Sequence, residues 1–597
     1  MTATSAQVRT ARPSSRLHRL RPELTKELML AVGLVIVGTL LPAVLGLDFW
    51  AQMMLLIDLY LIATIGLNIL MAEAGQISFG QGVVFGVAAY SSAMMMGGAG
   101  TGYVPAALVG LLAGTVVGGT MALPALRVQS YYLGFVTMAA ALAFPQVLFI
   151  FEKQTQATTG ISAFPGGFDI VLAPGITVLT VVMIVVASLA LVANALIRSS
   201  KFGRDMRMTG YSTEAASTLG MSPGRMRVAA FLVASLLGSI GGVLYLPVIG
   251  YAAPSSFAID LSITFFLAVV VGGSGTIIGP LVGLAVVYII PNALLANFEQ
   301  YRMILFGVIA FTVMYVMPDG IVGFVKKHLA ARRTGTGGEA VDMQVLVREV
   351  RAAAGQGGGR GGPALEVNAV TKSFGSVRAL AGATLNVKAG EIHGIVGPNG
   401  SGKTSLLNIL SGLYVADSGH VLLDGKDITS QSVIQRAHAG LGRTFQTPRV
   451  IDDLSAWENT DLGHPGSGDE SAMNAAVASQ ALAWDATPAK KLSHAQRRFL
   501  EVARVMNLGA RLWLLDEPAA GLSQTERREF GAMLRAVSDT WGTTIVIVEH
   551  DLELVWSLAD TVSVVSAGAV LASGTPADID ARDDVRHIFQ GVHHVED

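Results

Sequence analysis

The chain of 597 residues contains no cysteine, which excludes disulfides, thiolate zinc sites and cysteine nucleophiles together. Charge is also scarce: charged residues make up 14% of the chain, whereas soluble domains average about 25%. The net charge of −2 argues against a nucleic-acid-binding protein, since such proteins need a net basic face. In place of charge, the chain has 52% hydrophobic residues. This balance predicts that part of the chain lies within a lipid bilayer.

Long apolar runs fill residues 28–317, interrupted by one basic stretch at 198–227. Many runs contain about 17–22 residues, the length that crosses roughly 30 Å of hydrocarbon. The first run is followed by others and by no clear small-residue cleavage site, so we interpret it as a retained span rather than a removed signal. The candidate spans are 28–46, 51–72, 82–97, 104–122, 133–151, 176–197, 228–249, 258–273, 276–296 and 301–317. The sequence therefore predicts an all-α membrane domain with about eight to ten transmembrane helices, and the short, Gly-rich runs 82–97 and 258–273 are candidates for re-entrant or broken helices.

Segments rich in Lys and Arg flank these spans at 1–27, 198–227 and 326–333. Because such segments stay on the cytoplasmic side, all three are expected there, and an arrangement of about ten spans satisfies this. We therefore expect a multi-pass protein of the cytoplasmic (inner) membrane with both termini inside. The predicted order is a basic tail (1–27), a membrane domain (28–325), a flexible linker (326–363) and a soluble cytoplasmic domain (364–597).

In the soluble part, apolar strands (HGIVG, LWLLD, TIVIV, TVSVV) alternate with amphipathic helices, which predicts an α/β domain. The stretch GPNGSGKT lies between a strand and a helix, which is the context of a Walker A phosphate-binding loop. Its glycines let backbone N–H groups point at phosphate oxygens, and the helix N-terminus adds partial positive charge. Lys403 is expected to reach the β- and γ-phosphates and Thr404 to bind Mg²⁺; a plain Gly-rich turn is the competing interpretation. The expected ATP-binding residues of the loop are Gly397, Pro398, Asn399, Gly400, Ser401, Gly402, Lys403, Thr404 and Ser405.

In the stretch LWLLDEP, a predicted strand ends in two acidic residues, Asp516 and Glu517. Asp516 fits a Walker B ligand that holds Mg²⁺ through water. Glu517 fits a general base that orients water beside the γ-phosphate. Two acids after a strand also serve often as a helix N-cap, but their place after a Walker A loop favours the catalytic interpretation.

The order of Walker A, RTFQ, LSHAQ, LLDEP and VEHD resembles the ATPase domain of ABC transporters over 364–597. The resemblance implies ATP and Mg²⁺ as cofactors, and Gln446 as the glutamine that touches Mg²⁺ and senses the membrane domain. It implies that His550 contacts the γ-phosphate and that Phe374 stacks on adenine, although a Phe there could equally be core. The stretch PAAGLS resembles the D-loop without its usual aspartate.

The stretches TFQTPRVIDDLSAWEN, RRFLEVARVM and VIVEHDLELVWSLAD resemble more specifically the LivG-type ATPases of branched-chain amino acid importers. The chain departs from that type in length. Between Glu458 and the LSHAQ signature it is shorter than expected, which predicts a trimmed helical subdomain with a different membrane-facing surface.

The membrane half resembles LivM-type permeases over 28–325, on the stretches 61–93, 267–291 and 301–323. Polar residues within the spans are costly in a bilayer and are therefore functional candidates. The candidates for the transport pathway are Asp58, Asn68, Gln76 and Gln81, with Asp260 as a further polar residue near a span end. Interfacial solvation of the carboxylates, and hydrogen bonds from Asn68 and Gln76 to neighbouring helices, are the competing interpretations.

The basic loop contains STEAASTLG, whose pattern from Glu214 to Gly220 resembles the coupling helix that importers dock onto their ATPase. A short cytoplasmic helix between two spans needs a partner, because its apolar side chains would otherwise be exposed. We expect Ala215, Ala216, Leu219 and Gly220 to contact an ATPase domain near Gln446.

Together these resemblances imply a fused permease and ATPase of an ABC importer for branched-chain or related small amino acids. Urea, short amides or another small polar solute are alternative substrates, an exporter is a less favoured class, and a membrane-anchored ATPase without transport fits poorly. Because a working transporter needs two permeases and two ATPases, a second permease and a second ATPase are expected, with a hetero-oligomer favoured over a homodimer. An extracytoplasmic substrate-binding protein is also implied.

The signature LSHAQ has His494 and Ala495 where related ATPases usually have two glycines, while Ser493 and Gln496 remain. In the family this loop closes over the nucleotide of the partner ATPase. We expect Ala495 to crowd the γ-phosphate and to adopt a positive φ only at a cost. The resulting hypothesis is an asymmetric pair of ATP sites, in which LSHAQ covers the weaker one.

Overall fold

The computed structural model describes residues 22–98, 100–127, 130–294, 301–331, 363–463 and 487–590. Most of the expected tail and linker, and the expected shortened region before LSHAQ, lie outside these residues. The chain forms two compact units. The first comprises residues 1–210 and 224–334, and the second comprises 211–223 and 335–597.

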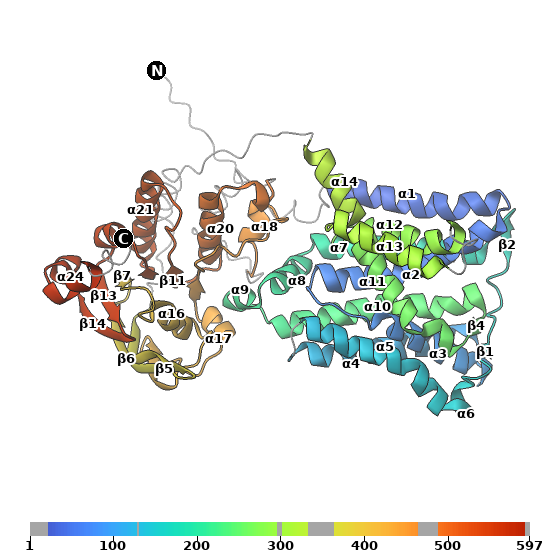
Figure 1. The fold of residues 1–597 in the computed structure, drawn as a ribbon, viewed down its shortest axis with the longest axis horizontal. Coiled ribbons are helices and arrows are strands. Elements are labelled where there is room, and N and C mark those ends of the chain that lie inside the picture. Colours follow the sequence, from blue (N-terminus) through green and yellow to red (C-terminus); the bar gives the residue numbers. More distant parts are fainter. Residues whose placement is uncertain are drawn as a thin grey trace, which may run out of the picture. The chain divides into compact units, whose positions relative to one another are not determined.

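The first unit is helical (Figure 1). Seven of its described helices are long and apolar enough to cross a membrane. The expected runs 82–97, 276–296 and 301–317 coincide with shorter helices. Within 276–296, residues Ala285–Leu294 form a π-helix. Its helices are α1 (Pro22–Val44), α2 (Asp48–Ala72), α3 (Gln81–Gly97), α4 (Tyr103–Ala125), α5 (Ser130–Ile150), α6 (Glu152–Thr155), α7 (Val178–Ser199), α8 (Lys201–Tyr211), α10 (Pro223–Ile249), α11 (Ile259–Gly272), α12 (Gly279–Leu284), the π-helix Ala285–Leu294, α13 (Arg302–Val316) and α14 (Gly320–Ala331).

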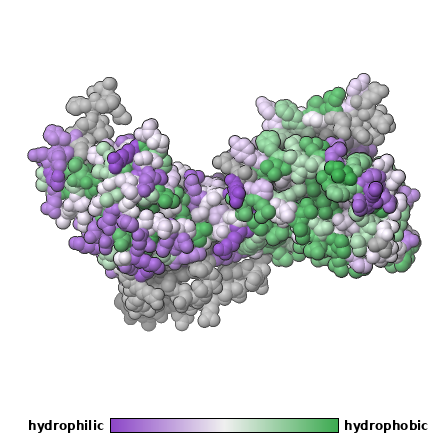
Figure 2. Space-filling model, turned by 90° about the horizontal axis from the view of Figure 1, so that it is seen from below, coloured by the Kyte–Doolittle hydropathy of each residue, from purple (hydrophilic) through white to green (hydrophobic). Residues whose placement is uncertain are grey.

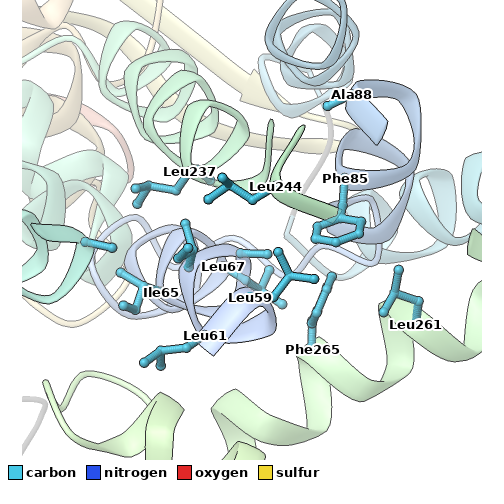
Figure 3. Packing of buried hydrophobic residues seen from close by; sticks show 14 of the residues in the cluster. Leu59, Leu61, Ile65, Leu67, Phe85, Ala88, Leu237, Leu244, Leu261 and Phe265 are labelled. Carbon is cyan, nitrogen blue, oxygen red and sulfur yellow. The ribbon is translucent and has the colours of Figure 1, made fainter. Parts of the chain in front are cut away.

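Helix α2 forms the centre of this unit, and nearly all its residues from Ile57 to Leu70 are buried. Phe85 from α3 packs against Phe265 from α11, with ring centroids 5.8 Å apart, beside Leu59 (Figure 3). The outer helices instead expose large apolar side chains such as Leu112, and hydrophobic residues cover much of the surface of this unit (Figure 2). An apolar exterior around a packed interior is what a protein dissolved in lipid requires.

Short strands lie in the connections of the helical unit. They are β1 (Ile161–Ser162) paired with β4 (Tyr251–Ala252), and β2 (Val171–Ala173) paired with β3 (Ile176–Thr177).

The second unit contains an α/β domain with two sheets. The larger has the order β10-β11-β12-β7-β13-β14, in which only the β13–β14 pair is antiparallel. The smaller is antiparallel with the order β6-β5-β8-β9. The strands are β5 (Leu365–Phe374), β6 (Val377–Val387), β7 (Ile392–Val396), β8 (Ser418–Leu423), β9 (Lys426–Asp427), β10 (Leu441–Arg443), β11 (Leu512–Asp516), β12 (Thr544–Val548), β13 (Thr561–Ser566) and β14 (Ala569–Gly574).

Helices surround the larger sheet. They are α16 (Lys403–Ser411), α17 (Val433–His438), α18 (Ala456–Thr460), α20 (His494–Asn507), α21 (Gln524–Trp541), α22 (Leu552–Leu558), α23 (Pro576–Asp580) and α24 (Asp583–Gln590), and α9 (Thr213–Thr218) also belongs to this unit. Strands β11, β12 and β7 are parallel neighbours that are buried throughout. The segments that follow them therefore meet at one edge of the sheet, where ligands bind in open α/β sheets.

Candidate functional site

The Walker A loop connects β7 to α16 at this edge. Gly400 and Gly402 have φ of +77° and +103°, which glycine adopts at little cost. The Nζ atom of Lys403 donates hydrogen bonds to the carbonyls of Gly397 and Pro398, both at 2.8 Å, so the ammonium lies inside the curve of the loop. Burial lowers the pKa of Lys403, and the nearby carboxylates of Glu517 and Asp516 oppose that change.

The other predicted loop residues occupy the turn and the first turn of α16. Asn399 and Thr404 are exposed, Pro398 and Ser405 are partly buried, and Ser401 is buried. The loop thus presents its backbone and the Thr404 hydroxyl outward, at the N-terminus of a helix that attracts anions.

Glu517 is held by two side chains from separate parts of the domain. Nε2 of Gln446 donates to one carboxylate oxygen at 2.9 Å, and Nε2 of His550 lies 2.9 Å from the other. Glu517 has φ of +46°, a left-handed conformation that is unusual for a residue with a side chain. Such backbone strain concentrates at functional sites. The structure therefore brings together three residues that the sequence placed in the reaction.

Asp516 is the last residue of β11 and is almost fully buried. Burial raises its pKa, while Arg443, whose Nη2 lies 3.6 Å from Oδ2, acts in the opposite direction. Glu549 precedes His550 and accepts a hydrogen bond from the N–H of Ala519 at 2.7 Å. Burial raises the pKa of Glu549 to about 7. The buried side chains of Arg443 and Glu549 thus both influence the two predicted acids: Arg443 acts on Asp516, and Glu549 interacts with Glu517.

Helix α20 holds the backbone on both sides of Gln446. Arg498 donates to the carbonyls of Phe445 and Gln446 at 2.7 and 2.6 Å. Glu501 accepts from the N–H groups of Phe445 and Arg449 at 3.2 and 3.3 Å. Sequence analysis missed these two residues; the available signal was a pair of charges at i and i+3 on the buried face of an amphipathic helix.

The signature residues begin the same helix. Ser493 is the N-cap of α20, and its side chain and that of Gln496 form a reciprocal capping box. The conformational cost considered for Ala495 does not arise here, because the residue lies in the first turn of a right-handed helix and does not have a positive φ. Alanine is the best helix former, so its backbone conformation carries no strain. His494 lies close to Gly521, where an added Cβ would meet the imidazole at 3.0 Å.

Phe374 ends β5 and is 42% exposed. Its ring packs edge-on against Tyr414 with centroids 5.1 Å apart, and the ammonium of Lys372 lies 5.6 Å from its centroid. A partly exposed aromatic ring in the ATPase domain is compatible with the predicted stacking on adenine, which stays a prediction.

Helix α9 contains Glu214, Ala215 and Ala216 of the predicted coupling residues, Leu219 and Gly220 follow directly after it, and all five belong to the second unit with the ATPase domain. Ala215, Ala216 and Leu219 are buried. An added Cβ on Gly220 would lie 2.9 Å from Nε2 of His438, at the end of α17. Glu214 on α9 interacts electrostatically with Arg443. This segment thus lies against α17 and, through Leu219, close to Gly463. The predicted contact near Gln446 stays a prediction.

The polar residues predicted for the pathway each have a partner within the helical unit. Asn68 accepts from the N–H of Gly275 at 3.0 Å and donates to the carbonyl of Thr276 at 3.2 Å. Gln81 donates to the carbonyls of Ala63 and Ala234, both at 2.9 Å. The bonds of Gln81 join α3 to α2 and α10, whereas Asn68 bonds to the connection between α11 and α12 rather than to a neighbouring helix.

Asp58, Gln76 and Asp260 differ in their surroundings. Asp58 is 2% exposed and accepts a hydrogen bond from the Thr39 hydroxyl at 2.6 Å, which joins α2 to α1. Gln76 donates to the carbonyl of Ala74, while its Oε1 is buried without a partner. Asp260 is exposed in the first turn of α11. The four pathway candidates, Asp58, Asn68, Gln76 and Gln81, thus each bond to different partners, and their role in transport stays a prediction.

Comparisons with known proteins match each half of the chain separately. A family model described as the permease component of the branched-chain amino acid transport system matches residues 49–317. An ABC transporter model matches residues 380–520. The branched-chain amino acid transport ATP-binding protein BraF of Pseudomonas aeruginosa is 31% identical over 250 residues, which cover 38% of this chain and 98% of BraF. The chain belongs to the ABC transporter family.

This ABC transporter joins a helical permease domain and an ATP hydrolase coupled to transport in one polypeptide. The ATP-binding protein LivG of Salmonella typhimurium is 32% identical over 251 residues, covering 38% of this chain and 98% of LivG. The ribose import ATP-binding protein RbsA 1 of Streptomyces coelicolor is 33% identical over 221 residues, covering 35% of this chain and 44% of that protein. A crystal structure of an ABC transporter cassette in its ADP conformation is 27% identical, with a TM-score of 0.35, and covers 38% of this chain and 99% of its own.

Proposed function

We propose that this ABC transporter imports branched-chain or related small amino acids. The main support for ATP hydrolysis as the driving reaction is the Glu517 carboxylate, which is held between Gln446 and His550. In this proposal Glu517 accepts a proton from a water molecule whose oxygen attacks the γ-phosphorus of ATP. The bond from the γ-phosphorus to the β–γ bridging oxygen breaks, and ADP and phosphate leave.

Mg²⁺ fits the residues at the site, since oxygen ligands are those it prefers. Asp516 offers a carboxylate and Thr404 a hydroxyl, and Gln446 keeps its carbonyl oxygen free for a ligand role because its Nε2 donates to Glu517. When bound, the ion would neutralise charge on the β- and γ-phosphates.

The direction of transport and the assembly belong to the same proposal. The positive-inside rule favours a cytoplasmic location for the basic loop that contains α9 and for the ATPase domain. A second permease and a second ATPase complete the transporter, in a hetero-oligomer, and an extracytoplasmic binding protein delivers the solute. Helix α9 transmits ATPase closure to the membrane domain.

The substrate follows from the relatives. The permease model and two of the ATPase relatives carry the name of branched-chain amino acid transport, which favours leucine, isoleucine and valine. Ribose is a second candidate, because a ribose import ATPase is 33% identical to this chain. Urea and short amides remain alternatives from the sequence.

The substrate is tested by thermal-shift screening of the cognate binding protein against leucine, isoleucine, valine, ribose, urea and short amides. We expect stabilisation by at least one branched-chain amino acid. Stabilisation by ribose or urea alone contradicts the amino acid assignment and leaves the importer class intact.

The asymmetric pair of ATP sites is part of the proposal and depends on Ala495. Its methyl group, rather than its backbone conformation, would weaken contact with the γ-phosphate of the partner ATPase. We expect Ala495→Gly to raise ATP turnover of the reconstituted complex. If Ala495→Gly leaves turnover and transport unchanged while Glu517→Gln abolishes both, the asymmetry is refuted.

A further inference from the structure

Arg436 lies at the C-terminal end of the phosphate-binding helix α16, although it comes from α17. Its side chain is fully buried. Nη1 donates to the carbonyls of Ile409 and Leu410 at 2.5 and 2.8 Å, in the last turn of α16. The other nitrogens bind Thr429 and Gln431 carbonyls at 2.9 and 3.2 Å, so the guanidinium ties α16 to the segment before α17.

This arrangement satisfies carbonyls that a helix C-terminus leaves without partners, and it places positive charge at the negative end of the helix dipole. Gly412, the C-cap, has φ of +82°, and an added Cβ there would lie 3.0 Å from Nε of Arg436. The close approach shows that the helix end and the guanidinium fit each other tightly. Arg443 reinforces the same helix by donating to the Leu407 carbonyl at 2.9 Å.

Helix α16 is short and begins at the Walker A lysine. It runs from Lys403 to Ser411, and nine helical residues span only about 13 Å. Because a helix of this length moves as a rigid rod, a displacement of its C-terminus also displaces the Lys403 end. Arg436 therefore holds the position of the phosphate-binding loop from the opposite end of its helix.

Helix α17 also contacts α9 in the 211–223 segment, which belongs to the same compact unit. His438 ends α17, two residues after Arg436, and lies against Gly220. Gly220 has φ of +75°, and an added Cβ would come within 2.9 Å of Nε2 of His438. The positive φ favours glycine, and an added Cβ would make the imidazole of His438 shift, so Gly220 is a point of close contact with α17.

We propose that Arg436 is the positioning residue that connects this contact to ATP binding. Movement of the 211–223 segment shifts α17 through His438, and the guanidinium carries the shift to the C-terminus of α16 and so to the Walker A loop. This connection from the 211–223 segment to the Walker A loop needs no contact between α9 and Gln446. It rests on the proposed coupling role of Glu214–Gly220, but its first test measures only nucleotide affinity.

The test measures binding of trinitrophenyl-ATP to the full-length chain in lipid nanodiscs. Arg436→Gln removes the fork that binds the α16 carbonyls, and we expect a roughly tenfold weaker affinity, equal to about 1.4 kcal/mol. Arg436→Lys keeps the buried charge but loses the several donors of the guanidinium. We expect this variant to fold and also to bind trinitrophenyl-ATP more weakly than the wild type.

Arg535→Gln is the matched control. Arg535 also donates to a carbonyl at a helix C-terminus, that of Leu558 in α22, but it does not touch α16. We expect its nucleotide affinity to equal that of the wild type. Wild-type affinity in a folded Arg436 variant, or an equal loss in Arg535→Gln, overturns the proposal.

The connection to Gly220 is tested by a double-mutant cycle with the same readout. Gly220→Ala pushes on His438, and we expect it to change nucleotide affinity in the wild-type background but not in Arg436→Gln. Additive effects of the two substitutions contradict the connection. Since no solute enters these measurements, a wrong substrate assignment would leave their outcome unchanged.

Discussion

At the scale of single residues, Glu517 is the best-defined feature of the molecule. Gln446 and His550 reach its two carboxylate oxygens from the segments that follow β10 and β12. The positive φ of Glu517 aims the carboxylate at this point. Two side chains from separate segments thus fix the orientation of the Glu517 carboxylate, which is the arrangement that its proposed role as general base requires.

His550→Ala removes one of the two contacts that hold Glu517. We expect kcat for ATP hydrolysis to fall by roughly 10²-fold or more, since a misplaced base loses most of its effect. ATP turnover of the full chain in nanodiscs measures this. His420→Ala, an exposed histidine that pairs with Asp427 on the smaller sheet, is the control and should keep wild-type turnover. A comparable loss in both variants would refute a specific role for His550.

Glu549 predicts a pH dependence of stability. Its pKa is raised by burial from 4.5 to about 7 in the folded protein, so the folded state keeps a proton that the unfolded chain has lost. The free energy of unfolding therefore declines through this group between these two pKa values and remains lower above the folded pKa. The decline is on the order of 1–3 kcal/mol.

Glu549→Gln cannot ionise and keeps an oxygen for the Ala519 N–H. We expect the variant to exceed the wild type in thermal stability near about pH 8, and to approach it near about pH 5. Thermal unfolding of the full chain in nanodiscs at both pH values measures the difference. Glu553→Gln removes the same charge from an exposed site and should not show this pH-dependent difference. An equal effect of Glu549→Gln at both pH values would disprove the account.

At the scale of elements, close packing of small residues joins the helices of the membrane domain. Helix α4 buries Gly110, Gly114 and Gly118 at spacings of one turn. An added Cβ on Gly114 would meet Ser239 Oγ at 2.4 Å and the Val84 carbonyl at 2.9 Å. Small residues let helix backbones approach closely, and the resulting van der Waals packing is one source of helix association in lipid.

Gly114→Ala should therefore lower the thermal stability of the full chain in detergent. Forcing a methyl group into this packed face costs about 1–3 kcal/mol. Gly33→Ala on α1 is the matched control, because no atom lies within 4 Å of the added Cβ, and it should cause no loss. Equal melting temperatures of the Gly114 variant and the wild type would show that this face is not closely packed.

The elements were largely predictable because each has a local signal. Apolar runs located the long helices, and the strand–loop–helix context located the Walker A loop. Long-range partners had no such signal: the bonds of Asn68 to Gly275 and Thr276 join residues far apart in the chain. The π-helix at Ala285–Leu294 and the right-handed conformation of Ala495 also depend on the folded context.

At the scale of the whole molecule, one chain combines a membrane permease with the enzyme that drives it. The fusion fixes their stoichiometry, and the 211–223 segment of the membrane half clusters with the ATPase domain. The central claim is that ATP hydrolysis at Glu517 drives solute uptake through this chain.

The most direct measurement is uptake of radiolabelled leucine by cells that produce the chain with its partner subunits and binding protein. The account predicts concentrative uptake by the wild type and none by Glu517→Gln, with the variant present in the membrane in equal amount and still able to bind ATP. Uptake by Glu517→Gln at the wild-type rate would contradict the account.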